Sequence, residues 1–255
     1  MSYITLGIPM IDSLLPDGMP RNSFILLFGE GGTGKSVALA QAAGNRIRLG
    51  EPCMFVTFDD SPSSIINNFL RLGYEVRGAL ANNILRIVDC FSFRARILPK
   101  PTDGIRVVQN PKDHHELTGT LLSTADGMEG KGAIFIDSLT EFFTISEPTS
   151  TLETVKNWRV EFCKMMSIPI FATYHIGLKT LDEFAAMIDY LVDGIIDFRF
   201  DPLLAQQGLL ARQLRVRKMK GAVHDTVWHY FTIERGGLVP MRTQGASEPA
   251  HKKSK

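Results

Sequence analysis

One short segment combines glycines, a lysine and a serine at a spacing that suits phosphate binding. In GEGGTGKS, residues 29–36, Gly29 is followed after four residues by Gly34, Lys35 and Ser36. Closely spaced glycines let successive backbone N–H groups turn toward one point, and a helix that begins there adds the positive end of its dipole. Lys35 would reach the β- and γ-phosphates of a nucleotide, and Ser36 would offer its hydroxyl to magnesium. The pattern predicts a polyphosphate site; the alternative is a glycine-rich connection that binds nothing.

The residues around this loop are those that its chemistry requires. The apolar run SFILLF, residues 23–28, reads as a buried strand, and residues 35–49 have one apolar face at helical spacing. Strand, loop and helix follow one another in the order of a phosphate-binding unit. The residues expected to contact the nucleotide are Glu30, Gly31, Gly32, Thr33, Gly34, Lys35, Ser36 and Val37.

Carboxylates follow two other apolar runs. Asp137 ends the run at 133–137 and would orient magnesium beside the phosphate loop. Asp59 and Asp60 follow the run at 53–58, where they would face the same crevice and activate the attacking water. The alternative for Asp137 is capping of the next segment, since aspartate often occupies that position. The alternative for Asp59 and Asp60 is a helix start, because Ser61 and Pro62 follow them and are well placed to begin one. Both roles are compatible for the adjacent pair.

Tyr174 and His175 end another apolar run, at 169–174. If this strand lies beside the strand of Asp137, the two side chains would stand at the edge that faces the nucleotide and could sense its γ-phosphate. An ordinary hydrogen-bonded role at a strand end is equally compatible with the sequence.

The elements that must position these residues alternate along the chain. Strand-like runs at 23–28, 53–58, 84–89, 133–137 and 169–174 are separated by helix candidates at 35–49, 62–73, 111–128, 151–166 and 180–191. This alternation predicts an α/β fold with a mostly parallel sheet covered by helices on both faces.

The pattern changes after residue 192. GIIDFRF, LLARQLRVRKM and VWHYFTIE read as strands with no helix between them, which predicts antiparallel strands that extend the sheet edge. The final GASEPAHKKSK is small, polar and basic, as in disordered tails. We therefore expect one domain over residues 1–242 and a disordered basic tail over 243–255.

Bulk properties exclude several classes of protein. The 28 Lys and Arg against 27 Asp and Glu give a formal net charge of +1, which favours neither a nucleic-acid partner nor an acidic one. No apolar run approaches the roughly 18 residues needed to span a bilayer, and no signal-type leader is evident, so a cytoplasmic protein without membrane insertion is expected. The three cysteines lie far apart, which suits buried thiols better than disulfides or a zinc site.

Four ordered motifs resemble the KaiC-like branch of the RecA/RadA superfamily of ATPases. The opening TLGIPMIDSLLPDGMPRNSFILLFGEGGTGKS resembles the segment that leads into the family's phosphate loop. FVTFDDSP resembles the strand that ends in paired acids, and LRIVDCFSFR resembles the strand after it. RQLRVRKMKGAVHDTVWHYFTIE resembles a late hairpin of the family. The likeness runs from about residue 5 to residue 240 and is to a single-domain, archaeal type.

The resemblance implies a RecA-like core that binds ATP with Mg²⁺ at the subunit interfaces of a homo-oligomeric ring, expected to be a hexamer. By position, Lys218, Lys220 and His224 would reach the nucleotide held by the neighbouring subunit; from the residues alone, a solvated strand face explains this basic segment as well. The family's paired acids are usually glutamates, so Asp59 and Asp60 would hold a base roughly 1.3 Å further back, and a misplacement of about 1 Å can reduce a rate about a hundredfold. Slow ATP hydrolysis in a regulatory protein is therefore expected.

Two other functions are compatible with the sequence. A RadA-like recombinase relative would bind single-stranded DNA through basic segments near residues 94–106 and in the tail, although the neutral charge balance disfavours nucleic acid. A nucleotide-gated accessory protein would bind ATP, change shape and hydrolyse almost none of it. An unidentified protein partner is compatible with each of these functions.

Overall fold

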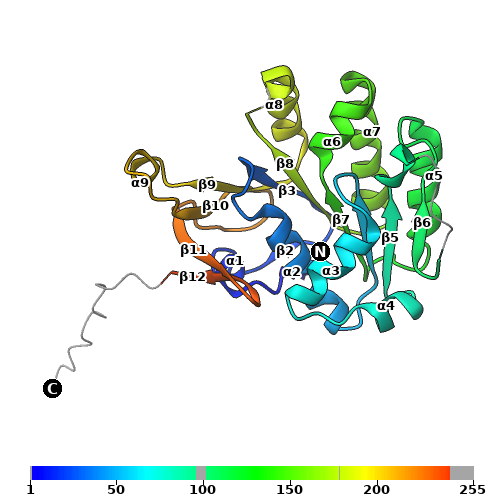
Figure 1. Ribbon diagram of the computed structural model, residues 1–255, viewed down its shortest axis with the longest axis horizontal. Coiled ribbons are helices and arrows are strands. Elements are labelled where there is room, and N and C mark those ends of the chain that lie inside the picture. Colours follow the sequence, from blue (N-terminus) through cyan, green and yellow to red (C-terminus); the bar gives the residue numbers. More distant parts are fainter. Residues whose placement is uncertain (1, 96–101, 178, 242–255) are drawn as a thin grey trace.

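The computed structural model describes residues 2–95, 102–177 and 179–241, and the expected tail at 243–255 lies outside them. A ten-stranded sheet runs through the described chain in the order β12-β11-β10-β9-β3-β8-β7-β4-β5-β6 (Figure 1). Its strands are β3 (Phe24–Gly29), β4 (Cys53–Thr57), β5 (Leu85–Asp89), β6 (Ile105–Val107), β7 (Ala133–Asp137), β8 (Ile170–His175), β9 (Gly194–Phe200), β10 (Arg212–Met219), β11 (His229–Glu234) and β12 (Gly237–Pro240). A separate antiparallel pair joins β1 (Tyr3–Ile4) to β2 (Met19–Pro20).

The strands from β9 to β6 are parallel, so their carboxyl ends share one edge of the sheet. Strands β10, β11 and β12 are antiparallel and extend the sheet beyond β9. The predicted α/β fold, with a mostly parallel sheet and an antiparallel C-terminal extension, is confirmed. The edge where parallel strands end is where ligands bind in such folds.

Helices cover both faces of the sheet, as Figure 1 shows. The first half of the chain supplies α1 (Pro9–Asp12), α2 (Lys35–Arg48), α3 (Pro62–Arg71) and α4 (Arg77–Ala81), together with the short 3₁₀ turn η1 (Ser92–Arg94). The second half supplies α5 (His114–Thr124), α6 (Leu139–Ile145), α7 (Pro148–Trp158), the π-helical η2 (Arg159–Met165), the 3₁₀ turn η3 (Lys179–Leu181), α8 (Asp182–Leu191) and α9 (Pro202–Gln206).

Alternating side chains of the central strand enter two separate hydrophobic cores. Ile25 and Leu27 of β3 pack with residues of α2, whereas Phe24 and Leu26 pack on the opposite face with residues of α5 to α8. All four side chains are buried. A strand that is buried on both faces reads as a continuous apolar run, which is why SFILLF predicted it well.

Three sequence predictions are corrected by the structure. GIIDFRF is not purely antiparallel: β9 pairs antiparallel with β10, as expected, but in parallel with β3 on its other side. The segment after it is not free of helix: α9 begins at Pro202, and the Asp201 carboxylate accepts hydrogen bonds from the first amides. The helix expected from residue 111 begins instead at His114, since the Asp113 side chain caps it.

Within the described ranges, no helix combines the length and the apolar character needed to cross a bilayer.

Candidate nucleotide site

The phosphate loop connects the end of β3 to the start of α2. Gly29 lies so close to β9 that a Cβ atom built on it would stand 1.9 Å from the Phe198 carbonyl oxygen. Gly34 precedes α2 with a φ of 106°, a backbone conformation that residues other than glycine rarely adopt. No side chain caps the start of α2. The first amides of α2 are therefore left to face a ligand, and an anion would meet the positive end of the helix dipole.

The Lys35 side chain is folded into this loop. It is only 2% exposed, and its Nζ donates hydrogen bonds to the carbonyl oxygens of Gly29, at 2.8 Å, and Glu30, at 2.6 Å. Burial lowers the pKa of Lys35 to about 8, although nearby Asp137, Glu30 and Asp59 act to raise it. Because its hydrogen bonds go to backbone carbonyl oxygens, the buried ammonium is available to a phosphate.

The other loop residues line the same turn. Thr33 is buried and donates its hydroxyl to the Glu30 carbonyl at 2.8 Å. A Cβ on Gly31 would meet nothing within 4 Å, and one on Gly32 would meet only the Phe200 ring, at 3.8 Å. A cavity of about 220 Å³ between α2 and α3 is lined by Ser36, Val37, Ala40, Phe55, Ile65, Asn68, Arg71, Leu72 and Asp137.

The predicted magnesium residues are brought together. Ser36, in the first turn of α2, donates its hydroxyl to Oδ1 of Asp137, at the end of β7, over 3.1 Å. Thr173 of β8 donates to the same oxygen at 2.5 Å. Burial raises the pKa of Asp137, and the hydrogen bonds from Thr173 and Ser36 oppose that rise. A hydroxyl beside a carboxylate offers the oxygen ligands that Mg²⁺ prefers, so these residues fit Mg-ATP.

The two adjacent aspartates occupy different environments. A ligand atom of Asp59 lies within 4.8 Å of one from Asp137 and one from His175. Burial of its carboxyl group and the nearby charge of Asp137 raise the pKa of Asp59 to about 6, even though part of the residue is open to solvent. Asp59 therefore faces the magnesium residues.

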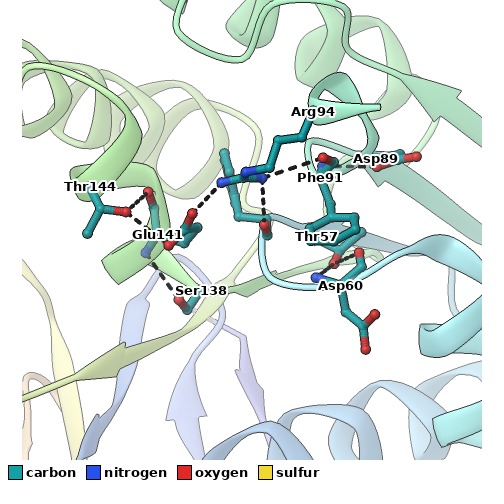
Figure 2. Close-up of polar contacts among 9 residues, drawn as sticks. Thr57, Asp60, Asp89, Phe91, Arg94, Ser138, Glu141 and Thr144 are labelled. Carbon is teal, nitrogen blue, oxygen red and sulfur yellow. Dashed lines mark hydrogen bonds and ion pairs between the residues drawn. The ribbon is translucent and has the colours of Figure 1, made fainter. Parts of the chain in front are cut away.

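Asp60 instead belongs to the turn that starts α3. Its Oδ1 accepts a hydrogen bond from the Ser61 amide at 2.8 Å, and its carbonyl oxygen accepts one from the Thr57 hydroxyl at 2.7 Å. Figure 2 shows its carboxylate pointing away from Arg94 and Glu141. The start of α3, with Ser61 as its cap, is as the sequence alternative expected.

The two residues at the end of β8 face different surroundings: His175 lies at the site and Tyr174 in the core. His175 joins the group of Asp59 and Asp137, and burial lowers its pKa to about 4, with the charge of Lys35 acting in the same direction. Tyr174 is fully buried, donates its hydroxyl to the Leu181 carbonyl at 3.3 Å and stacks on Phe28. Only the histidine faces the phosphate loop.

The three basic residues expected to act on a neighbour are not brought to this chain's own phosphate loop. Lys218 pairs with Ile195 near the amino end of β9, whereas the phosphate loop begins beside Phe198. This separation of three residue steps spans about 10 Å along the strand. Lys218 Nζ donates to the Asp189 carbonyl at 2.5 Å, Lys220 is exposed, and Nδ1 of His224 lies 3.1 Å from the Ala222 carbonyl oxygen.

Three side chains at this edge were missed from the sequence. Thr173 precedes the Tyr174–His175 pair in the strand beside Asp137, and its position there was the one available signal. Arg212 of β10 donates to the Gly32 carbonyl at 3.2 Å, and Arg94 lies beside the end of β4. The two arginines approach from distant parts of the chain, so no local pattern marks them.

The strand, phosphate loop and helix, with the Ser36 hydroxyl on Asp137, define the P-loop class of nucleoside triphosphatases. The sequence model of the KaiC ATPase family matches residues 4–244, and the chain belongs to that family.

Full-length relatives and a solved structure agree with this assignment. A UPF0273 protein of Methanocaldococcus jannaschii is 30% identical over 240 residues, which cover 94% of this chain and 96% of the relative. A UPF0273 protein of Thermotoga maritima is 26% identical, with 95% and 97% covered. The crystal structure of a KaiC-like protein of Pyrococcus horikoshii superposes with a TM-score of 0.76 over 94% of this chain and 99% of that chain, at 19% identity, which supports the fold.

Proposed function

We propose that this protein binds ATP with Mg²⁺ at the phosphate loop and hydrolyses it slowly, as a regulatory ATPase. The observation that carries the proposal is the Lys35 ammonium, buried against the carbonyls of its own loop beside the Ser36–Asp137 pair. Membership of an ATPase family supports it. We also propose that the protein is cytoplasmic and is a KaiC-like ATPase of the archaeal type.

Each residue of the site has a separate role in this proposal. The loop amides and Lys35 bind the phosphates and offset their charge, while Ser36 and Asp137 would hold Mg²⁺, which supplies charge neutralisation at the phosphates when bound. Asp59 faces this edge and orients and polarises the attacking water. Asp60 shapes the turn beside it and is the second candidate for that role.

The slow rate follows from the length of the side chain. An aspartate carboxylate stands roughly 1.3 Å further back than that of a glutamate, and a misplacement of about 1 Å reduces a rate by up to about a hundredfold. The test is conversion of ATP to ADP by wild type, Asp59→Asn and Asp60→Asn, with ATP binding measured in parallel. We expect Asp59→Asn to bind ATP and to lose turnover.

The same experiment distinguishes a slow ATPase from a second candidate function, a nucleotide-gated accessory protein. If wild type retains ATP without forming ADP, while Lys35→Met binds none, the protein is a nucleotide-gated accessory protein and the hydrolysis proposal is wrong. The position of Asp59 makes this outcome specific, because a water-activating group that cannot reach its water leaves binding intact.

We further propose that the protein assembles as a homo-oligomeric ring, a hexamer, in which Lys218, Lys220 and His224 contact the nucleotide of the neighbouring subunit. Their distance from this chain's own phosphate loop supports action on a neighbour. Mixing Asp59→Asn subunits with Lys218→Ala/Lys220→Ala subunits tests this. Recovery of ATPase activity in the mixture, above either variant alone, is expected; activity of the lysine variant alone at the wild-type rate would contradict it.

A further inference from the structure

One ion pair connects three strand ends beside the proposed site. The guanidinium of Arg94, at the end of η1, pairs with the Glu141 carboxylate of α6 (Figure 2). It also donates to the carbonyl oxygens of Phe58, at 3.5 Å, and Phe91, at 3.4 Å. Arg94 therefore touches the segments that follow β4, β5 and β7, and the first of these carries Asp59.

Glu141 is tied in turn to the magnesium edge. Its amide donates to Oγ of Ser138, the residue directly after Asp137, at 3.2 Å. Ser138 also lies close enough to the Asp59 carboxyl group to act to lower its pKa. The Thr144 hydroxyl donates to the second Glu141 oxygen at 2.9 Å, so the carboxylate is held from both sides. Contacts thus lead from Arg94 through Glu141 to Ser138, directly after Asp137, and through the Phe58 carbonyl to the residue before Asp59.

The Arg94 side chain is itself well held. Its guanidinium lies 4.6 Å from the ring centroid of Phe93 and 5.5 Å from that of Phe91. The turn that presents it is anchored by the buried Asp89, whose Oδ1 accepts hydrogen bonds from the amides of Phe91, at 3.0 Å, and Ser92, at 2.9 Å. A side chain fixed by packing and by backbone contacts can fix its neighbours.

Fold stability does not account for this arrangement. The side chains of Arg94 and Glu141 are 36% and 32% exposed, and ion pairs open to water contribute little to stability. The pair lies close enough to the proposed site for the charges of Glu141 and Arg94 to act on the Asp59 carboxyl group. What the pair determines is the position of the Asp59 segment relative to α6 and to Asp137.

We propose that Arg94, acting through Glu141, is a positioning residue that holds Asp59 against Asp137 for activation of water. This inference rests on the ATP hydrolysis proposed above. The hydrogen-bond partners of Arg94 are Glu141 and the carbonyls of Phe58 and Phe91, none of them in the phosphate loop, so its loss should affect turnover and leave ATP binding intact. Lysine in its place keeps the charge but loses the planar fork that spans Glu141 and the two carbonyls.

The experiment compares Arg94→Ala, Arg94→Lys and Glu141→Gln with wild type in the intact chain. Steady-state ATP hydrolysis gives kcat, Mg-ATP titration gives Kd, and thermal unfolding gives Tm. We expect Arg94→Ala to lower kcat about tenfold or more, with Kd within about threefold of wild type and Tm within about 3 °C. Arg94→Lys should recover part of kcat, and adding Glu141→Gln to Arg94→Ala should lower it little further.

Arg77→Ala is the matched control, because Arg77, the first residue of α4, forms an exposed ion pair with Glu75 away from the site. Its kcat, Kd and Tm should equal those of wild type.

Two results would overturn the inference alone. In one, Arg94→Ala hydrolyses ATP within twofold of wild type. In the other, kcat, ATP binding and Tm fall together and Arg94→Lys restores none of them, which marks a purely structural tie. Wild-type protein that binds ATP without turnover would instead contradict the proposed hydrolysis, and this inference would fall with it.

Discussion

Replacing Lys35 with methionine should weaken ATP binding and stabilise the nucleotide-free protein. Methionine nearly preserves the volume of the side chain, so the buried site is not left with a cavity. The ammonium is 2% exposed and its pKa is lowered from 10.5 to about 8, mainly by burial. The folded state therefore disfavours the charged form that dominates at neutral pH.

The size of the effect follows from these quantities. A pKa difference between 10.5 and about 8 corresponds to about 3 kcal/mol of destabilisation below pH 8, which diminishes as the pH rises from 8 to 10.5. The hydrogen bonds to the carbonyls of Gly29 and Glu30 are lost in the variant and offset about 1 kcal/mol each. A net stabilisation of about 1 kcal/mol remains, or about 2–4 °C in Tm.

ATP binding should change in the opposite direction. The charged contact to phosphate is worth about 3 kcal/mol, so Lys35→Met should raise the Kd for Mg-ATP by a factor of roughly 100 or more. Excess Mg-ATP should raise the Tm of wild type and leave that of the variant unchanged. Thermal unfolding of nucleotide-free protein at pH 7 and pH 10, followed by calorimetric ATP titration, measures both effects.

The control is Lys156→Met, which removes an exposed lysine paired with Glu153 on α7. Its Tm should be close to that of wild type and its ATP affinity unchanged. Wild-type ATP affinity in Lys35→Met would refute the site assignment. A lower Tm for nucleotide-free Lys35→Met at pH 7, with the same deficit at pH 10, would refute the desolvation reasoning.

Three further outcomes are expected. Burial and the charge of Asp137 raise the pKa of Asp59 to about 6, so kcat/KM for ATP should fall about tenfold for each pH unit below about 6. A kcat/KM that stays constant down to pH 5 would exclude Asp59 as the general base. Gly29→Ala should lower the free energy of unfolding, measured in urea, by about 2–4 kcal/mol, because its Cβ would stand 1.9 Å from a carbonyl oxygen. Gly31→Ala is the control: its Cβ would meet nothing within 4 Å, so this variant should unfold like wild type. Burial would raise the pKa of Asp193, but hydrogen bonds from two basic side chains and a backbone amide lower it below its usual value. Asp193→Asn should therefore lower the free energy of unfolding by about 2–4 kcal/mol at pH 7, and the difference from wild type should narrow as the pH falls below about 4. A difference in unfolding free energy that stays constant with pH would show that the charge of Asp193 does not stabilise the fold.

The parts of the molecule that the sequence predicted are those with a local signature. The phosphate loop is a contiguous pattern between a strand and a helix, and Asp137 ends an apolar run, so each can be recognised without knowing the neighbouring strands. The parallel core follows from strands alternating with helices. The Ser36–Asp137 contact could be anticipated because a phosphate loop requires such a carboxylate.

The parts that the sequence could not predict depend on which strands become neighbours. GIIDFRF has the same composition whichever way it pairs, and only its place between β3 and β10 makes it parallel to one neighbour and antiparallel to the other. Thr173 reaches the site from β8 and Arg94 from the turn after β5, so their contacts depend on the sheet order. The division of Asp59 and Asp60 into different roles depends on a single turn, which adjacent identical residues do not reveal.

The most direct test starts from nucleotide-free protein, adds Mg-ATP and follows the bound nucleotide over time by native mass spectrometry. We predict one ATP for each chain, slow replacement of ATP by ADP, and no bound nucleotide in Lys35→Met measured in the same way. Wild-type protein that remains without nucleotide, or a Lys35→Met variant that is loaded as fully as wild type, would contradict the assignment of this site.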